Sequence, residues 1–213
     1  MVAPVIRPAT RDDADFLAWT IFVASRGHLA RGWFDIMLDR PEAFCLDFCR
    51  RLVLADAVSW WHWSLFHVAE MDGAVASALC VFGGDGVYQA SSAAMTEASR
   101  GIGLSKDEHQ KLWPRGSFIM STVTGEDDAW TVENVATLPR YRGQGAVQAL
   151  IARGLDAGRA AGFKRAQISF LIGNDAAERA YAKAGFVFAE EKRAPEFEAA
   201  MGTPGVKRFA RDI

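Results

Sequence analysis

The segment from residue 130 to residue 160 constrains the fold of this chain more than any other. Residues 130–138 have the apolar and β-branched composition of a strand, and Pro139 ends it. A helix then begins at Gly143 to Gly145, and one of its faces carries apolar residues and glycines at helical spacing: Val147, Leu150, Ile151, Gly154, Leu155 and Gly158. Because glycines on an apolar helix face carry no side chain, this pattern predicts a helix that lies close against a sheet.

The turn between this strand and this helix, residues 140–146, is suited to bind an anion. Glycines at 143 and 145 let backbone N–H groups point into one concave turn. The helix N-terminus adds partial positive charge, and Arg140 and Arg142 add full charges, which predicts a pyrophosphate site. A dinucleotide-binding turn would need a glycine where Gln148 stands, and a P-loop would need Gly-Lys-Ser/Thr, so both are disfavoured.

The remaining elements predict an α/β or α+β fold in one domain, residues 1–213. Residues 83–128 are expected to form a largely helical insertion, at about 85–128, in which Pro114 ends a helix. The expected strands are 5–6, 64–70, 74–82, 130–138, 164–172, one beginning at 186, and 206–213. The expected helices are 11–24, 34–55 with a break near Pro41, 143–161 and 174–185.

Composition and charge exclude several classes of protein. The formal net charge of −2 argues against nucleic-acid binding, and the apolar stretches are too short to span a membrane. Cys45 and Cys49 stand one helical turn apart, but no further ligands follow, so we expect packing rather than a metal site. With no secretory signal at the N-terminus, we expect a reduced, cytoplasmic protein.

Two blocks of the sequence point to a known family. Arg140, Gly143 and Gly145 follow a strand-ending proline, and a second block places Asn174, Ala177 and Tyr181 before Gly185-Phe186. In both blocks the chain resembles the GNAT superfamily of acetyl-CoA-dependent N-acetyltransferases. The resemblance in motifs covers residues 130–187. It implies a mixed, mostly antiparallel central sheet flanked by helices, with fourth and fifth strands that splay apart.

The resemblance also implies roles for particular residues. Acetyl-CoA would be the co-substrate, with its pyrophosphate on the turn from Arg142 to Ala146, beside Arg140. The backbone of the fourth strand would hold the pantetheine arm, and an N–H near Ala136 would face the thioester carbonyl. Asn174 would contact the arm, and Tyr181 would protonate the departing thiolate. The implied cofactor-binding residues are Val135, Ala136, Thr137, Arg140, Arg142, Gly143, Gln144, Gly145, Ala146 and Asn174.

Catalysis also requires a deprotonated amine. An alkylamine with a pKa of about 10 is neutral at pH 7 in only about one part per thousand. Glu133 is our candidate base, because strand alternation places it on one face with Val135 and Thr137. Alternatively, Glu133 lies on a solvated edge or pairs with an arginine. Asn174 is equally suited to cap a helix, and Tyr181 to pack in the core.

The acceptor is the least constrained part of the prediction. We expect a small-molecule amine, held between residues 25–33, the cluster Trp60-Trp61-His62-Trp63 and the insertion. Tryptophans bind cationic amines by cation–π attraction, although a core role for this cluster is favoured. Glu126 and its acidic neighbours either attract a cation or form an ordinary turn. Alternatives are a non-catalytic acyl-CoA-binding module and an enzyme acting on a protein or peptide amine. A homodimer through the late strands is possible.

Overall fold

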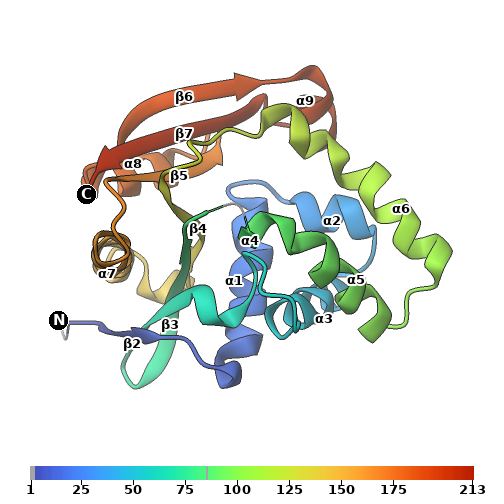
Figure 1. Cartoon of the computed structure of the whole chain (residues 1–213), viewed down its shortest axis with the longest axis horizontal. Coiled ribbons are helices and arrows are strands. Elements are labelled where there is room, and N and C mark those ends of the chain that lie inside the picture. Colours follow the sequence, from blue (N-terminus) through green and yellow to red (C-terminus); the bar gives the residue numbers. More distant parts are fainter. Residues whose placement is uncertain (1–2, 85) are drawn as a thin grey trace.

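Within residues 3–84 and 86–213, which the computed structural model describes, seven strands form one sheet (Figure 1). Their order is β1-β2-β3-β4-β5-β7-β6, and every neighbouring pair is antiparallel except β4 and β5. The strands are β1 (Val5–Pro8), β2 (Phe66–Met71), β3 (Ala74–Phe82), β4 (Trp130–Thr137), β5 (Arg165–Leu171), β6 (Val187–Arg193) and β7 (Gly205–Asp212). Each strand begins within two residues of its expected start.

Helices cover both faces of this sheet. Helices α7 and α8 pack on the face that carries Val81 and Val132, whereas α1 and α3 pack on the face that carries Phe66 and Cys80. The helices are α1 (Ala14–Arg26), α2 (Trp33–Leu38), α3 (Glu42–Val53), α4 (Gly86–Gln89), α5 (Ser91–Gly101), α6 (Lys106–Gly116), α7 (Ala146–Ala160), α8 (Asp175–Lys183) and α9 (Pro195–Met201).

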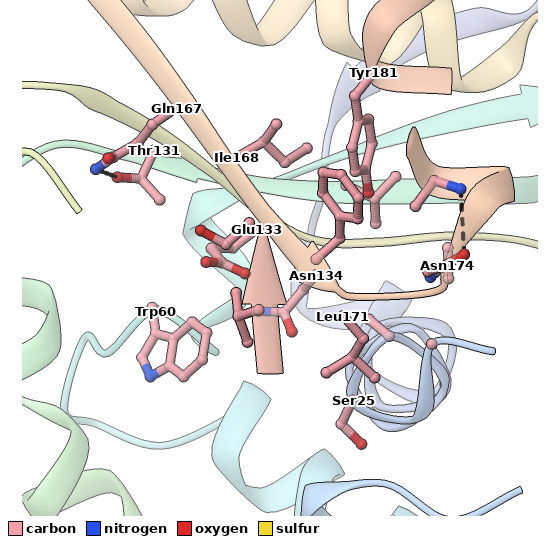
Figure 2. A pocket seen from close by; sticks show the side chains of 18 of the residues that line it. Ser25, Trp60, Thr131, Glu133, Asn134, Gln167, Ile168, Leu171, Asn174 and Tyr181 are labelled. Carbon is pink, nitrogen blue, oxygen red and sulfur yellow. Dashed lines mark hydrogen bonds between the residues drawn. The ribbon is translucent and has the colours of Figure 1, made fainter. Parts of the chain in front are cut away.

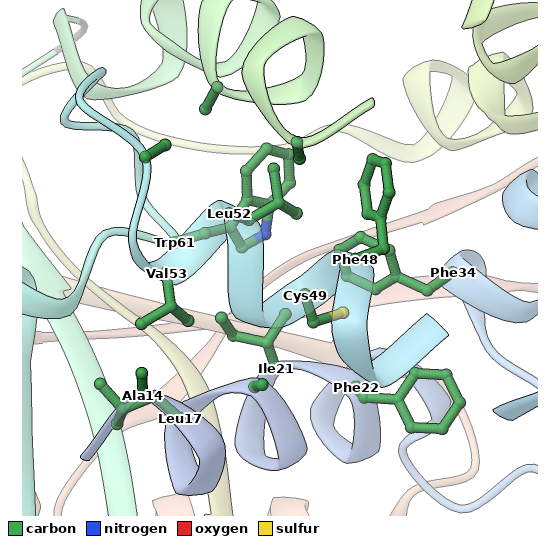
Figure 3. Close-up of a cluster of buried hydrophobic side chains, with 14 of the residues drawn as sticks. Ala14, Leu17, Ile21, Phe22, Phe34, Phe48, Cys49, Leu52, Val53 and Trp61 are labelled. Atoms are coloured by element: carbon green, nitrogen blue, oxygen red, sulfur yellow. The ribbon is translucent and has the colours of Figure 1, made fainter. Parts of the chain in front are cut away.

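The core between α1, α3 and the sheet explains the apolar pattern of the N-terminal third. Figure 3 shows α1 and α3 side by side, with Ile21 of α1 facing Cys49 of α3, and Leu52 of α3 beside Trp61. Both Cys49 and Cys45 are fully buried thiols in this cluster, as their pattern predicts. Burial raises the pKa of both thiols, which keeps them protonated and unreactive.

Helix α7 lies close to the sheet at its two glycines, as the sequence predicts. A Cβ on Gly154 would lie 2.9 Å from Cγ1 of Val81, and one on Gly158 would lie 2.7 Å from the ring of Trp130. The Trp130 Nε1 donates to the carbonyl of Gly154 over 2.9 Å. Glycine is therefore required at both positions for this approach.

The insertion is helical, but one boundary prediction is wrong. Ser105 and Glu108 form the expected capping box at the start of α6. Pro114 does not end this helix, which continues to Gly116 and into a 3₁₀ helix at Ser117–Thr122. Proline removes the N–H that would bond the carbonyl of Gln110, and in the last turn of a helix this single loss is tolerated.

Helix α9 was not expected from the sequence. Pro195 stands in its first turn, and Gly202 ends it in the left-handed region with φ of 76°. These residues are the usual start and stop signals of a helix, here separated by only seven residues. Phe197 of α9 packs edge-on against Phe118, with ring centroids 5.7 Å apart.

Among the described residues, no helix is long and apolar enough to cross a lipid bilayer.

Strands β4 and β5 separate along their length, which confirms the splayed arrangement. They pair in parallel only from Trp130 to Val132 of β4, opposite Ala166 to Ile168 of β5. Beyond Val132 the edge of β4 has no strand partner on this side in the described chain. This separation creates the space in which the candidate site lies.

Candidate active site

A cavity of about 1380 Å³ occupies the gap between the diverging strands. Its walls come from β4, β5, the turn before α7, the start of α8, the end of α1 and the insertion. Figure 2 shows Glu133 and Asn134 of β4 and Tyr181 of α8 directed toward this space. Segments that are far apart in the sequence therefore share one site.

The turn before α7 presents backbone groups to the cavity. Gly143 and Gly145 have φ of 76° and 88°, in the left-handed region that favours glycine. A Cβ at either position would meet no described atom within 4 Å, so the space above the turn is open. Gly145 is the N-cap residue of α7, and no described side chain caps this end. The N–H groups of this helix terminus therefore face open space, an arrangement that binds anions.

The predicted phosphate-binding residues fall into two groups. Arg142 lines the cavity together with Gly143, Gly145 and Ala146, and its Nε donates to the carbonyl of Thr137 over 3.3 Å. Arg140 and Gln144 do not line the cavity. The guanidinium of Arg140 lies 4.9 Å from the ring centroid of Tyr141, and Gln144 Nε2 donates to the carbonyl of Arg140 over 2.9 Å.

A β-bulge in β4 corrects one prediction about Glu133. Asn134 has a left-handed φ of 49°, and the register with β3 shifts at this point. Glu133 lies opposite Cys80, whereas Thr137 lies opposite Ser77 and shares a 2.7 Å hydroxyl hydrogen bond with it. Cys80 and Ser77 are three residues apart and so face opposite sides of β3. Glu133 therefore does not share a face with Thr137, because the extra residue of the bulge inverts the alternation.

Glu133 reaches the cavity from the side of the sheet that α1 and α3 cover. Burial of its carboxyl raises the pKa to about 8, and the N–H of Asn134 offsets part of this effect. No arginine or lysine of the described chain lowers this pKa. Glu133 is thus neither on a solvated edge nor in an ion pair, the two alternatives that the sequence left open.

Tyr181 combines a packed ring with a hydroxyl at the cavity. The side chain is buried, and its ring meets Phe170 edge-on, with centroids 5.5 Å apart. Figure 2 shows Tyr181 directed from α8 into the cavity. Burial, and then the negative charge of Glu133, raises the pKa of the phenol. Tyr181 is therefore a neutral proton donor at physiological pH.

Asn174 is the N-cap residue of α8 and also lines the cavity. Its Oδ1 accepts a hydrogen bond from the N–H of Ala177 over 3.2 Å, the dashed line in Figure 2. The capping role is therefore confirmed. It engages the oxygen of the amide, whereas the Nδ2 group makes no hydrogen bond within the described chain and can donate to a ligand.

All three segments expected to hold the acceptor reach the cavity. Residues 25–33 contribute Trp33, the tryptophan cluster contributes Trp60 and Trp61, and the insertion contributes residues 118–120. The sequence left two roles open for this cluster, packing in the core and a position at the acceptor site, and two neighbouring tryptophans differ in this respect. Trp61 is almost fully buried in the core, whereas Trp60 is half-buried and faces the cavity. His62 and Trp63 do not line it.

Sequence reasoning missed several residues at the cavity. Asn134 lines it at the bulge, and its buried Nδ2 has no hydrogen-bond partner in the described chain. Lys192 reaches it from the β6 edge, where its Nζ donates to the carbonyl of Val123. The position of Asn134 carried a usable signal, because asparagine tolerates left-handed backbone at a bulge. No local signal in the sequence places Lys192 here.

The other polar candidates have structural roles. Glu126 forms ion pairs with Arg165 at 2.8 Å and with Arg208 at 2.7 Å, which supports the interpretation as an ordinary turn. His62 accepts a hydrogen bond from the N–H of Ser64, and Nδ1 of His109 lies 2.8 Å from the Ser99 hydroxyl. In the ranges that the structure describes, no three histidine, cysteine or acidic side chains are grouped to hold a metal ion.

Comparison with known proteins identifies the family. A family model described as "Acetyltransferase (GNAT) family" matches residues 33–186, more than half of the chain. This chain belongs to the GNAT acetyltransferase family. It is accordingly an acyltransferase, of a family that uses acetyl-CoA as acetyl donor. No curated protein sequence matches it.

Solved GNAT structures share the fold of this GNAT protein at low sequence identity. An N-acetyltransferase from Staphylococcus aureus Mu50 is 19% identical with a TM-score of 0.68, over 98% of this chain and 100% of that one. An acetyltransferase that is 17% identical has a TM-score of 0.70, over 98% and 99% of the two chains. N-acetylglutamate synthase from Neisseria gonorrhoeae, complexed with coenzyme A and N-acetyl-glutamate, is 15% identical with a TM-score of 0.50. That match covers this whole chain but 35% of the synthase.

Proposed function

We propose that this GNAT protein transfers the acetyl group of acetyl-CoA to the primary amine of a small molecule, by direct attack in a ternary complex. One observation carries the proposal. A single cavity joins an open anion-binding turn, the unpaired edge of β4, an unpaired carboxyl at Glu133 and a neutral phenol at Tyr181. These are the groups that acyl transfer to an amine requires.

The cavity fits the parts of acetyl-CoA. The open turn from Arg142 to Ala146 suits the pyrophosphate, with Arg140 and Gln144 proposed as contacts at its outer rim. Asn174 has an amide N–H group to offer the pantetheine arm. When bound, acetyl-CoA supplies the acetyl group as a thioester, which is activated toward attack by an amine.

The backbone of β4 supports a more specific assignment of the oxyanion donor. The N–H of Leu138 donates to the carbonyl of Ala76 over 2.9 Å, so it points toward β3. Because N–H directions alternate along a strand, the N–H of Ala136 would also point toward β3. Those of Val135 and Thr137 would point to the open edge. We therefore assign pantetheine pairing and oxyanion stabilisation to these two neighbours of Ala136.

Glu133 and Tyr181 would then move the protons. The Glu133 carboxylate accepts the proton of the incoming ammonium group, which gives the free amine that attacks the thioester. With a pKa of about 8, about a tenth of Glu133 is ionised at pH 7. A cation beside the carboxyl would favour ionisation further. Tyr181 gives its proton to the departing thiolate, and its phenolate takes up the second proton that the attacking nitrogen loses as the amide forms.

The insertion supports a small molecule over a peptide as acceptor. Trp113, Phe118 and Ile119 of the insertion line the cavity, and Lys192 and Val206 line it from β6 and β7. A peptide would need a continuous open groove at this place. A homodimer stays a prediction. The exposed side chains Val187 and Phe188 on the edge strand β6 are compatible with one.

The test is thiol release from acetyl-CoA with a panel of small amines and peptides, beside calorimetric titration of acetyl-CoA. We expect tight binding of acetyl-CoA and turnover with one class of small amine. Turnover with peptides but with none of the small amines would show that the acceptor is a protein and not a small molecule. If acetyl-CoA did not bind, the proposed function would be wrong.

A further inference from the structure

The acceptor side of the cavity is walled by a continuous set of aromatic rings. Trp33 stacks on Trp61 with ring centroids 6.2 Å apart, and Trp61 contacts Trp60 at 4.9 Å. Tyr88 of α4 extends the set, 5.7 Å from Trp60 and 5.1 Å from Phe82 of β3. All five side chains line the cavity. Four separate segments of the chain thus build one aromatic wall, in which neighbouring rings are tilted against one another by between 16° and 82°.

The unpaired carboxyl lies at the border of this wall. Glu133 is opposite Cys80 in the pairing of β4 with β3. The Cys80 thiol donates to the carbonyl of Trp60 over 3.2 Å, so Trp60 and Glu133 are placed on the same side of the sheet. Figure 2 shows the ring of Trp60 and the carboxyl of Glu133 beside the same part of the cavity.

Other charged groups at the cavity are unsuited to hold a second charge of the acceptor. The Glu126 carboxylate is already paired with two arginines, and Asp127 is exposed. Lys192 donates to a backbone carbonyl, and Arg142 stands at the anion-binding turn. Arg179 and Lys183 also line the cavity, but they are exposed, and an ion pair at an exposed position is worth little. A second ammonium or a carboxylate on the acceptor would therefore meet only exposed or already engaged partners.

We infer that the acceptor is a monoamine carried on a flat aromatic body, with its ammonium group at Glu133 and its ring on Trp60. The inference rests on the proposed acetyl transfer and narrows its substrate class. Burial of the ring and its stacking on the indole of Trp60 favour binding, and the ammonium group forms an ion pair with the otherwise unpaired carboxyl of Glu133. Trp60 is then a specificity-determining residue.

The experiment compares kcat/KM for 2-phenylethylamine with kcat/KM for propylamine, putrescine and phenylalanine. We expect 2-phenylethylamine to exceed the other three by about 100-fold, the scale of discrimination for burying a ring-sized apolar group. In Trp60→Leu the ratio of 2-phenylethylamine to propylamine should fall by about 10-fold. This ratio is independent of the fraction of folded enzyme, so misfolding of the variant cannot mimic the effect.

Trp63→Leu is the matched control, because it makes the same change outside the cavity and should leave the ratio unaltered. A wild-type ratio near one, or a preference for putrescine or phenylalanine, would overturn the inference while acetyl transfer stands. Lack of turnover with 2-phenylethylamine in protein that binds acetyl-CoA would also overturn it. Failure to bind acetyl-CoA would instead remove the proposed function.

Discussion

Replacement of Glu133 by glutamine should stabilise the protein and inactivate it. In the folded protein, burial raises the pKa of this carboxyl from 4.5 to about 8. Below about pH 4.5 the carboxyl is protonated in both the folded and the unfolded state, so folding has no electrostatic cost there. Between the two pKa values the unfolded chain loses the proton and the folded protein keeps it. The stability of the wild type therefore falls as the pH rises toward 8.

The magnitude follows from the two pKa values. Each pH unit between them lowers the free energy of unfolding by about 1.4 kcal/mol, which gives about 5 kcal/mol as an upper bound above pH 8. Water that enters the cavity reduces this, so we expect about 2 to 5 kcal/mol. Glutamine has nearly the same shape and no charge, so the variant avoids the cost. For a chain of this length the gain corresponds to a Tm higher by about 4–20 °C.

The assay is thermal unfolding of the wild type and Glu133→Gln at pH values from 5 to 9. The difference in Tm should be small at pH 5, grow until about pH 8 and then stay constant. Glu198→Gln, at an exposed position of α9, is the matched control and should follow the wild type. Parallel curves for all three proteins would refute the reasoning, because a solvated Glu133 would give no pH-dependent difference.

The same carboxyl should control activity. The kcat/KM of the wild type should rise with pH through about 8. Glu133→Gln should lose this rise, and its kcat/KM should be lower by about 10²–10⁴-fold.

Five further substitutions test the cofactor side and the acid. Tyr181→Phe removes only the hydroxyl, so it should lower kcat by about 10²-fold or more and leave the affinity for acetyl-CoA unchanged. Steady-state kinetics and calorimetry measure the two quantities. An unchanged kcat would exclude Tyr181 as the acid. Gly145→Ala and Gly73→Ala both place a Cβ at positive φ, 88° and 77°, and should each cost about 1 kcal/mol of stability in thermal unfolding. Only Gly145→Ala should raise the KM for acetyl-CoA, and equal KM values would contradict the anion site. Arg142→Ala should raise the KM for acetyl-CoA by about 10-fold, and Arg140→Ala should raise it by less, because only Arg142 lines the cavity. A larger effect of Arg140→Ala would show that the phosphate lies on the outer side of the turn.

The motif-rich part of the site could be predicted from the sequence because its function depends on local backbone geometry. Gly143 and Gly145 adopt the positive φ that glycine favours, and Asn174 caps the helix that it precedes. Both features are set by residues within one turn of the chain. The strand starts and the close approach of α7 follow in the same way from short-range periodicity.

Errors arose where a regular pattern has a local exception. The alternation of β4 predicted that Glu133 shares a face with Thr137, and a single bulge residue at Asn134 reversed it. Pro114 was expected to end α6, but its position in the last turn made the lost hydrogen bond tolerable.

The sequence by itself pointed to the family, the order of the seven strands and the positive-φ glycines of the turn before α7, and it proposed Glu133 and Tyr181 as the catalytic pair. Only the tertiary structure decided the environments of these groups. In it no cation of the described chain lowers the pKa of Glu133, and Trp60 lies on the same side of the sheet as Glu133. Periodicity and turn chemistry act over a few residues, whereas burial, and the pKa that follows from it, depends on which distant segments exclude water from the same place.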